Sequence, residues 1–433
     1  MTPPPVTERR VAIVGALMVM LGPVSLALYT PALPTLVLAF GTTEAMLKLS
    51  VTVYFFGFAF AQLVCGPMSD AWGRRPVALG FFSIYLGGSV LAAAAPTVEF
   101  LLAGRALQGI GVAAGVAISR AIVRDLFVGQ ASARIMNLIG LILAIAPLVS
   151  PLLGGVIVST LGWHPIFLAM VIFGVAVMLA LAFGLPETNA APDPELARPA
   201  RVMASYRTLL ADRAFMRSGL ALGIALGGLY TQAALLPFVL IGRLGLTPTE
   251  FGLTTVFQTG SYAFGAFVTG RLLARTDAMR LVPVGLGIVA AAGAALFVAV
   301  HVLPPTVSVA IVPSMLWAFG IALLMPGAMT GAMAGFGAIA GAASALLGFL
   351  QIAGGFAGSG VAALFPDPLV ALAVILPVMA GLAGLAHLML RPRRGTPVAR
   401  TPEPTDIEIA ADPAGLIGAA GDEIEAERLR KSA

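Results

Sequence analysis

The side chains that could do chemistry are few, and their types and spacing indicate binding and pairing rather than catalysis. The chain has one cysteine, Cys65, and three histidines, His164, His301 and His387, which lie far apart in the sequence. One cysteine cannot form a disulfide framework or a cysteine-based metal site. The sequence contains no Ser/His/acid set, metal-ligand cluster or phosphate-binding loop. We therefore predict a protein that is not an enzyme, with no catalytic residues, no cofactor and no metal.

The most specific polar segment joins two apolar runs at residues 66–76, which read GPMSDAWGRRP. Gly66 and Gly73 allow a tight turn and a close approach of helices. Asp70 can accept backbone N–H groups at the start of a helix, whereas Arg74 and Arg75 can face an anionic membrane surface or pair with acids. An ordinary basic loop would explain only the arginines, so the combination indicates a specific, structured turn.

Two further segments place polar or small residues inside apolar runs. Arg105 and Gln108 lie within the run that begins at Glu99. An arginine inside a membrane span is costly and normally faces a cavity or a partner, although its long side chain could also extend to the outer interface. Residues 150–155 read SPLLGG, and such small residues could simply allow helices to pack closely.

The elements that must position these side chains are membrane helices. The chain has 433 residues, of which 59% are hydrophobic and only 10% charged, with a mean hydropathy of +0.99. Soluble domains carry roughly a quarter charged residues. This composition excludes a soluble enzyme, a mainly disordered chain and a nucleic-acid-binding protein, and it indicates a polytopic membrane protein.

Charge-free runs of about 20 residues are long enough to cross a bilayer. The sequence predicts twelve such spans, and hence an all-α membrane protein built from two six-helix halves. The spans lie within residues 11–43, 49–69, 76–98, 99–124, 135–186 (two spans, divided at 162–165), 218–242, 251–270, 281–366 (three spans) and 368–390.

Polar stretches divide the chain into five parts. We expect an N-terminal segment at 1–10, a first half at 11–186, a polar central linker at 187–213, a second half at 214–390 and a tail at 391–433. The linker could contain a short interfacial helix around 205–211. The tail is acidic and contains prolines, and its end at 421–431 could form a charged helix.

The distribution of basic residues predicts the orientation. If the N-terminus lies in the cytoplasm, all of the 25 basic residues except Lys48, Arg105 and Arg243 fall on the cytoplasmic side. This agrees with the positive-inside rule, so we expect both termini in the cytoplasm. The first apolar run contains three prolines and no convincing cleavage site, which favours a retained first helix over a signal peptide.

The turn at 66–76 resembles the signature loop of the major facilitator superfamily, Gly-x-Leu-x-Asp-(Arg)-x-Gly-Arg-(Arg/Lys). One departure is Ala71, where a basic residue is usual. The resemblance implies a conformational latch made of Gly66, Asp70, Gly73, Arg74 and Asp125. In it, Asp70 would dock against the cytoplasmic end of helix 11 and Arg74 would pair with Asp125 at the end of helix 4. Such a latch closes the cytoplasmic side and favours the outward-facing state.

Two other segments resemble motifs of drug antiporters within this superfamily. Residues 105–111 (RALQGIG) match the Arg-x-x-Gln-Gly-x-Gly pattern, and Pro151, Gly154 and Gly155 match a motif that kinks helix 5. Residues 29–34, 121–125, 237–240, 245–252 and 343–351 further resemble the bicyclomycin/chloramphenicol (Bcr/CflA-type) efflux subgroup. The resemblance implies a monomer in the bacterial inner membrane that exports small amphiphilic solutes by alternating access, in contact with membrane lipids.

One departure bears on energy coupling. Many members of this subgroup have an aspartate in helix 1 where this chain has Ala27. All aspartates and glutamates of this chain are predicted at membrane edges, in loops or in tails. Two alternatives stay open: protons couple through Asp70, Glu99 or Asp125, or the protein is a substrate-gradient-driven facilitator or importer of an anionic or zwitterionic metabolite. Without a nearby acid, Arg105 would make the cavity positive and favour anionic, zwitterionic or electronegative neutral solutes.

The solute cavity is expected to be lined by polar or aromatic residues near the middle of helices 1, 2, 4, 7, 8, 10 and 11. Each of these residues could instead bridge packed helices. A receptor or a passive channel built on the same helices is the alternative outside the transporter class. The candidates are Tyr29, Tyr54, Arg105, Gln108, Tyr230, Gln232, Gln258, Tyr262, Trp317, Met325 and Gln351.

Overall fold

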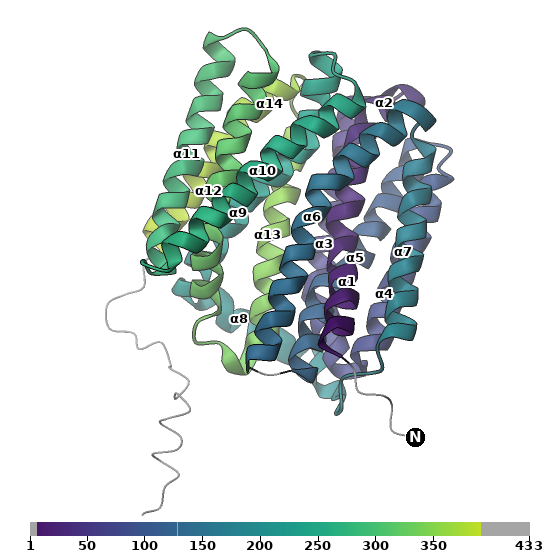
Figure 1. Ribbon diagram of the computed structural model, residues 1–433, viewed down its shortest axis with the longest axis vertical. Helices are drawn as coiled ribbons and strands as arrows, with labels where there is room; N and C mark the ends of the chain where they lie inside the picture. Colours follow the sequence, from purple (N-terminus) through teal and green to yellow (C-terminus); the bar gives the residue numbers. More distant parts are fainter. Residues whose placement is uncertain (1–6, 128, 391–433) are drawn as a thin grey trace, which may run out of the picture.

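The computed structural model describes residues 7–127 and 129–390, and within these ranges the regular structure is entirely helical. Helices of the first part of the chain lie on one side of the bundle and helices from α9 onward on the other (Figure 1). The first six long helices are α1 (Glu8–Tyr29), α3 (Glu44–Trp72), α4 (Arg74–Ala93), α5 (Val98–Leu126), α6 (Gly129–Leu161) and α7 (His164–Gly184). The second six are α9 (Arg213–Pro237), α10 (Pro248–Leu273), α11 (Ala278–Val302), α12 (Val307–Met333), α13 (Ala340–Ala362) and α14 (Pro368–Met389).

Short helices connect or extend the long ones. Among the described residues, ten helical segments are long and apolar enough to cross a membrane; α6 and α10 complete the twelve spans of the fold. The short elements are η1 (Thr30–Ala32), α2 (Leu33–Ala39), η2 (Pro194–Ala197), α8 (Pro199–Ala211), the π-helical turn η3 (Phe238–Arg243) and η4 (Gly337–Ile339).

Helix boundaries follow local chemistry. Thr43 and Thr247 begin α3 and α10 by accepting backbone N–H groups with their hydroxyls, and Glu250 completes a capping box with Thr247. Such caps satisfy amide groups that have no partner within the helix. Gly73 separates α3 from α4 with a φ of +98°, and Gly162 separates α6 from α7 with a φ of +82°. Residues with a Cβ rarely adopt these values.

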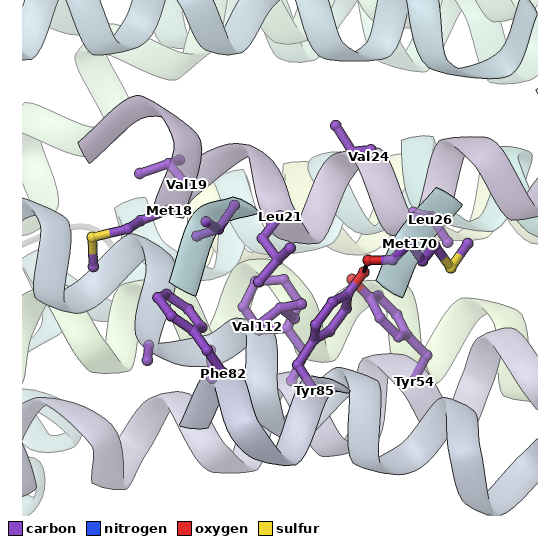
Figure 2. Close-up of a cluster of buried hydrophobic side chains, with 14 of the residues drawn as sticks. Met18, Val19, Leu21, Val24, Leu26, Tyr54, Phe82, Tyr85, Val112 and Met170 are labelled. Carbon is purple, nitrogen blue, oxygen red and sulfur yellow. Dashed lines mark hydrogen bonds between the residues drawn. The ribbon is translucent and has the colours of Figure 1, made fainter. Parts of the chain in front are cut away.

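The buried side chains form two hydrophobic cores. One is built almost entirely from residues 11–185 and the other from residues 206–383. Figure 2 shows part of the first core, where α1 contributes Met18 and Leu21, α4 contributes Phe82 and Tyr85, and α7 contributes Met170. Each core is thus assembled from consecutive helices.

The predicted division at residues 162–165 and the predicted last span agree with the observed helices. The first apolar run differs, because η1 and α2 continue it as far as Ala39 instead of forming a loop. The helix predicted around 205–211 is present and begins earlier, at Pro199. The N-terminal segment 1–6, the tail after Leu390 and its predicted helix at 421–431 lie outside the described residues.

A buried tyrosine of helix α8 forms a hydrogen bond with the bundle. The hydroxyl of Tyr206 donates a hydrogen bond to the carbonyl of Leu63 in α3 over 2.6 Å. Burial raises the pKa of the Tyr206 phenol above its usual value, so it stays a neutral donor. The connection between the two sets of helices is therefore tied to α3 of the first set.

Candidate functional site

Arg105 lies at the centre of a buried aromatic cluster in the first core. Its side chain is fully buried, and its guanidinium carbon lies 4.3 Å from the ring centroids of both Tyr29 and Tyr54. The two ring faces attract the cation. Its Nη1 also donates a hydrogen bond to the Oε1 of Gln108 over 2.7 Å. The structure therefore brings together four of the predicted cavity residues, one from α1, one from α3 and two from α5.

The surrounding hydrogen bonds fix these side chains. The Tyr29 hydroxyl lies 2.6 Å from the Ser50 hydroxyl, and the Tyr54 hydroxyl donates to the carbonyl of Gly22 over 2.9 Å. The amide of Gln108 donates to the Ser89 hydroxyl over 2.8 Å. Among the described residues, the Nε and Nη2 of Arg105 are buried without a hydrogen-bond partner, so here the cation is held by the rings and one amide rather than by a carboxylate.

Tyr85 belongs to the same region but was not among the predicted residues. Its hydroxyl lies 2.6 Å from that of Ser25, and it also donates weakly to the carbonyl of Met170 over 3.4 Å. Sequence reasoning passed over Tyr85 because it considered only the helices that line the cavity in the superfamily, and α4 is not one of them. The signal available in the sequence is a tyrosine in the middle of an apolar span.

Four of the predicted residues in the second set of helices form two pairs. The Nε2 of Gln258 donates to the Oε1 of Gln232 over 2.8 Å, which joins α10 to α9. The Tyr262 hydroxyl lies 3.2 Å from the sulfur of Met325. Neither pair forms a hydrogen bond with the residues of the Arg105 cluster described above.

Trp317 is fully buried inside the second core. Its indole N–H donates to the carbonyl of Ala225 over 2.9 Å, and its ring packs on Gly228. A tryptophan with its N–H satisfied and its ring enclosed is part of the packing of α12 against α9.

Tyr230 lies at the boundary between the two cores and packs against both. Tyr230 is half-buried, and its ring centroid lies 5.0 Å from that of Phe55 in α3. Gln351 of α13 is also half-buried. Nearby, Thr52 of α3 donates to the hydroxyl of Ser359 in α13 over 3.0 Å. Helices α3, α9 and α13 therefore form a mixed polar and aromatic contact between the cores.

The predicted latch residues also lie together. Arg74 is largely buried, and its Nε donates to a carboxylate oxygen of Asp125 over 2.9 Å. Its Nη1 forms an ion pair with Asp70 and donates to the Ser69 hydroxyl over 2.8 Å. One arginine thus links the end of α3 to the end of α5. We call this end of the bundle the latch end.

A glutamate that the sequence analysis did not select completes the latch. The carboxylate of Glu187 accepts the backbone N–H groups of Arg74 and Arg75 over 2.9 and 3.0 Å, which caps the start of α4. A Cβ at Gly73 would lie 2.6 Å from this carboxylate. Across the core boundary, a carboxylate oxygen of Asp70 lies 3.9 Å from the position that a Cβ of Gly341, near the start of α13, would occupy.

The helix 5 motif lies where α6 meets two other helices. A Cβ at Gly154 would lie 2.4 Å from the carbonyl oxygen of Leu28, and one at Gly155 would lie 2.2 Å from that of Pro248. Helix α6 runs without interruption through Pro147 and Pro151. The glycines therefore permit backbone contact with α1 in the same core and with α10 in the other core.

The two ends of the bundle each contain a hollow. At the latch end, a cavity of about 410 Å³ is lined by residues of both cores. At the other end, which we call the lysine end, a cavity of about 360 Å³ surrounds Glu44 and Lys48. Lys48 is fully buried there and lies 3.4 Å from both the Glu44 carboxylate and the carbonyl of Phe365. Lys48 thus connects α3 to the segment before α14.

Two helical cores, polar contacts between them and cavities at opposite ends define a polytopic carrier of small molecules rather than an enzyme. The chain belongs to the Major Facilitator Superfamily, whose family model matches residues 15–359. Proteins of this class are membrane transporters for small-molecule solutes.

Curated relatives extend over most of the chain. It is 30% identical over 355 residues to the uncharacterized MFS-type transporter YdgK of Bacillus subtilis (strain 168), covering 80% of this chain and 87% of that protein. It is 28% identical to multidrug resistance protein D of Escherichia coli (strain K12), covering 81% and 88%. Multidrug resistance protein MdtL of Shigella flexneri is 29% identical, with coverage of 78% and 84%.

Solved structures support the fold. The D-xylose-proton symporter superimposes with a TM-score of 0.67 at 17% identity, covering 89% of this chain and 98% of that one. The human organic anion transporter MFSD10 superimposes with a TM-score of 0.65 at 20% identity, covering 89% and 100%. At these identities the likeness concerns the fold alone.

Proposed function

We propose that the protein is an alternating-access exporter of small amphiphilic solutes, of the Bcr/CflA type. The observation that carries this proposal is the boundary between the two cores, which holds a hollow at each end and is crossed by a few contacts near each of them. The lysine end is crossed by Lys48 and by the backbone contact of Gly155 with Pro248. The latch end is crossed by the contact of Arg120 with Ser344. The hollows at both ends have walls from both halves of the chain. Relatives named multidrug resistance proteins support export as the direction.

We further propose that residues 11–186 and 214–390 move as two halves joined by the linker at 187–213. Each half corresponds to one of the hydrophobic cores. The latch residues all belong to the first half, with Gly341 of the second half nearby. In this proposal Asp70 lies beside the start of α13 while the latch end is closed, and the two separate when that end opens. The protein then acts as a monomer in the bacterial inner membrane, with the latch end and both termini in the cytoplasm.

A second candidate concerns coupling. Every aspartate and glutamate within residues 7–127 and 129–390 lies in the first or last turn of a helix, at its N-cap, or in a connection. Position 27, two residues before Tyr29, is an alanine. A proton-coupled carrier needs a group that titrates as the cavity changes sides. These observations favour a facilitator or exchanger driven by the solute gradient.

Counterflow in liposomes tests both candidates. The purified protein is reconstituted with a pH-sensitive dye inside the vesicles, and chloramphenicol or 4-benzoylbenzoate is added outside. Trans-stimulated uptake of radiolabelled solute without a pH change would support the exchanger. A solute-dependent pH change would mean that Asp70, Glu99 or Asp125 carries protons. Absence of trans-stimulation for every solute, in protein that is shown to be folded, would contradict the carrier function.

A further inference from the structure

The hollow at the latch end has the size and the walls of a solute site. Its volume is about 410 Å³, within the range of roughly 300–1,000 Å³ that is usual for small-molecule sites. Residues of α3, α4, α5 and α6 form one wall, and residues of α12 and α13 form the other. A molecule bound there would touch both cores, as a solute that stabilises one state of a carrier must do.

The charge of this hollow is positive. The described residues of its lining include Arg74, Arg120 and Arg124 but one acid, Asp70. Arg74 is already paired with Asp70 and Asp125. Among the described residues, Arg120 and Arg124 have no carboxylate within 4.0 Å. They are four residues apart on α5 and therefore share one face of the helix, and both are exposed.

One of these arginines already contacts the opposite wall. The Nη1 of Arg120 lies 3.5 Å from the hydroxyl of Ser344 in α13. This contact is long for a hydrogen bond, so a charged acceptor could replace it at little cost. An anion placed between Arg120 and Arg124 would then lie beside the Ser344 hydroxyl as well.

The remaining surface suits an apolar body of variable shape. Met136 of α6 lies in one wall, and Met329 and Met333, one turn apart on α12, lie in the other. Methionine side chains are flexible and polarizable, and they adapt to ligands of different shapes. The hollow therefore combines two available cations with an adaptable apolar surface.

We propose that this hollow binds amphiphiles that carry one anionic group. Arg120 and Arg124 hold a carboxylate, sulfonate or phosphate, and the three methionines contact the apolar part. The anion is either a water-soluble solute or the headgroup of a membrane lipid, since both present the same chemistry. The inference rests on the proposed function only for the statement that the bound molecule is then transported.

Photolabelling tests this site without measuring transport. The full-length protein in phosphatidylcholine nanodiscs is irradiated with 4-benzoylbenzoate, a carboxylate whose benzophenone attacks nearby C–H bonds. The matched neutral probe is 4-benzoylbenzamide. Peptide mapping should find the carboxylate attached to Met136, Met329 or Met333, with the neutral probe labelling these positions at least about 10-fold more weakly, because a charge-assisted hydrogen bond is worth about that factor.

Two substitutions locate the anion. Arg120→Gln and Arg124→Gln should each reduce carboxylate labelling of the methionines about 10-fold. The control is Arg280→Gln, which removes an exposed arginine on α11 that does not line the hollow and should change nothing. Undiminished labelling by the neutral probe shows that each variant is folded. Equal labelling by the two probes in the wild type, or full carboxylate labelling in both glutamine variants, would overturn the proposal.

A third arm separates the two sources of anion and the two proposals. Replacing part of the phosphatidylcholine by phosphatidylglycerol should leave labelling unchanged if the site selects a soluble solute, and should compete with it if the site takes a lipid headgroup. Either result supports an anion site. Counterflow without methionine labelling would reject this site and leave the carrier function intact. Methionine labelling without counterflow would support the site and reject the carrier function.

Discussion

Two of the three arginines of helix α5, Arg105 and Arg120, lie in opposite surroundings. Arg105 is fully buried in the first core and held between two tyrosine rings. Arg120 lies fifteen residues further along, about 22 Å away at the rise of an α-helix, and lines the hollow between the cores. The contacts of Arg105 with Tyr29, Tyr54 and Gln108 lie within one core, whereas Arg120 faces helices of the other core.

The comparison indicates that the environment of an arginine, rather than its presence in an apolar span, decides its role. The Arg105 cluster joins α1, α3 and α5, so changing it should affect the fold of the first core as well as transport. Arg120 contributes one long contact, so changing it should affect solute binding alone.

Arg105→Ala should give the largest loss. It removes the cation from between Tyr29 and Tyr54 and leaves a cavity, which should lower the free energy of unfolding by about 2–5 kcal/mol, as for other truncations of large buried side chains. Counterflow should be abolished. Denaturant unfolding in detergent measures the loss of stability. Arg120→Gln is the control and should unfold at the same denaturant concentration as the wild type. An Arg105→Ala variant as stable as wild type would break the contrast.

Gly155→Ala should force α6 and α10 apart at the lysine end. The added Cβ would meet the Pro248 carbonyl at 2.2 Å, and overpacking of this kind costs about 1–3 kcal/mol. The matched control is Gly260→Ala in α10, where a Cβ meets nothing within 4 Å and a glycine-to-alanine change in a helix is favourable. Thermal unfolding compares the two, and equal melting temperatures would contradict the observed backbone contact.

Asp125→Asn should loosen the latch. It removes the charge from a hydrogen bond to Arg74 that is 2.9 Å long, and bonds to charged groups are worth about 1.5–3 kcal/mol. Hydrogen exchange of the amides at 70–75 should accelerate accordingly. Glu195→Gln, which alters an exposed pair with Arg198, serves as the control and should cost less than about 1 kcal/mol.

The pair of Glu44 and Lys48 should show the smallest effect. Because burying an ion pair costs desolvation, Lys48→Met together with Glu44→Gln should leave stability within about 1 kcal/mol of wild type. Glu44→Gln alone should be more destabilising, because it leaves the buried Lys48 ammonium without its carboxylate at 3.4 Å. A double-mutant cycle measures the coupling, and additive effects would show that the pair does not interact.

Much of the fold follows from where charges are absent. Apolar runs predict the helices because each helix must cross the bilayer with its backbone bonded internally. The break at Gly162 and the span beginning at Pro368 illustrate this. The approach of Arg74 to Asp125 was implied by resemblance, and the two residues are indeed in contact.

The site is less predictable because it depends on how helices rotate and pack. The sequence predicts that Arg105 lines a cavity. In the structure, the rings of Tyr29 in α1 and Tyr54 in α3 enclose its guanidinium instead. Trp317 is likewise enclosed. Arg120 was passed over because its role depends on Met329 and Ser344, more than 200 positions away. The contact of Lys48 with Phe365 has the same long-range origin.

The proposed function requires that the two ends of the bundle open in alternation. We would measure it with spin labels in a Cys65→Ala background, comparing the pair Gln130 and Arg280 at the latch end with the pair Glu99 and His301 at the lysine end. All four positions are exposed. On addition of 4-benzoylbenzoate, we expect the distance between the two labels to decrease in one pair and to increase in the other. Distances that stay fixed, or that change in the same direction at both ends, would contradict it.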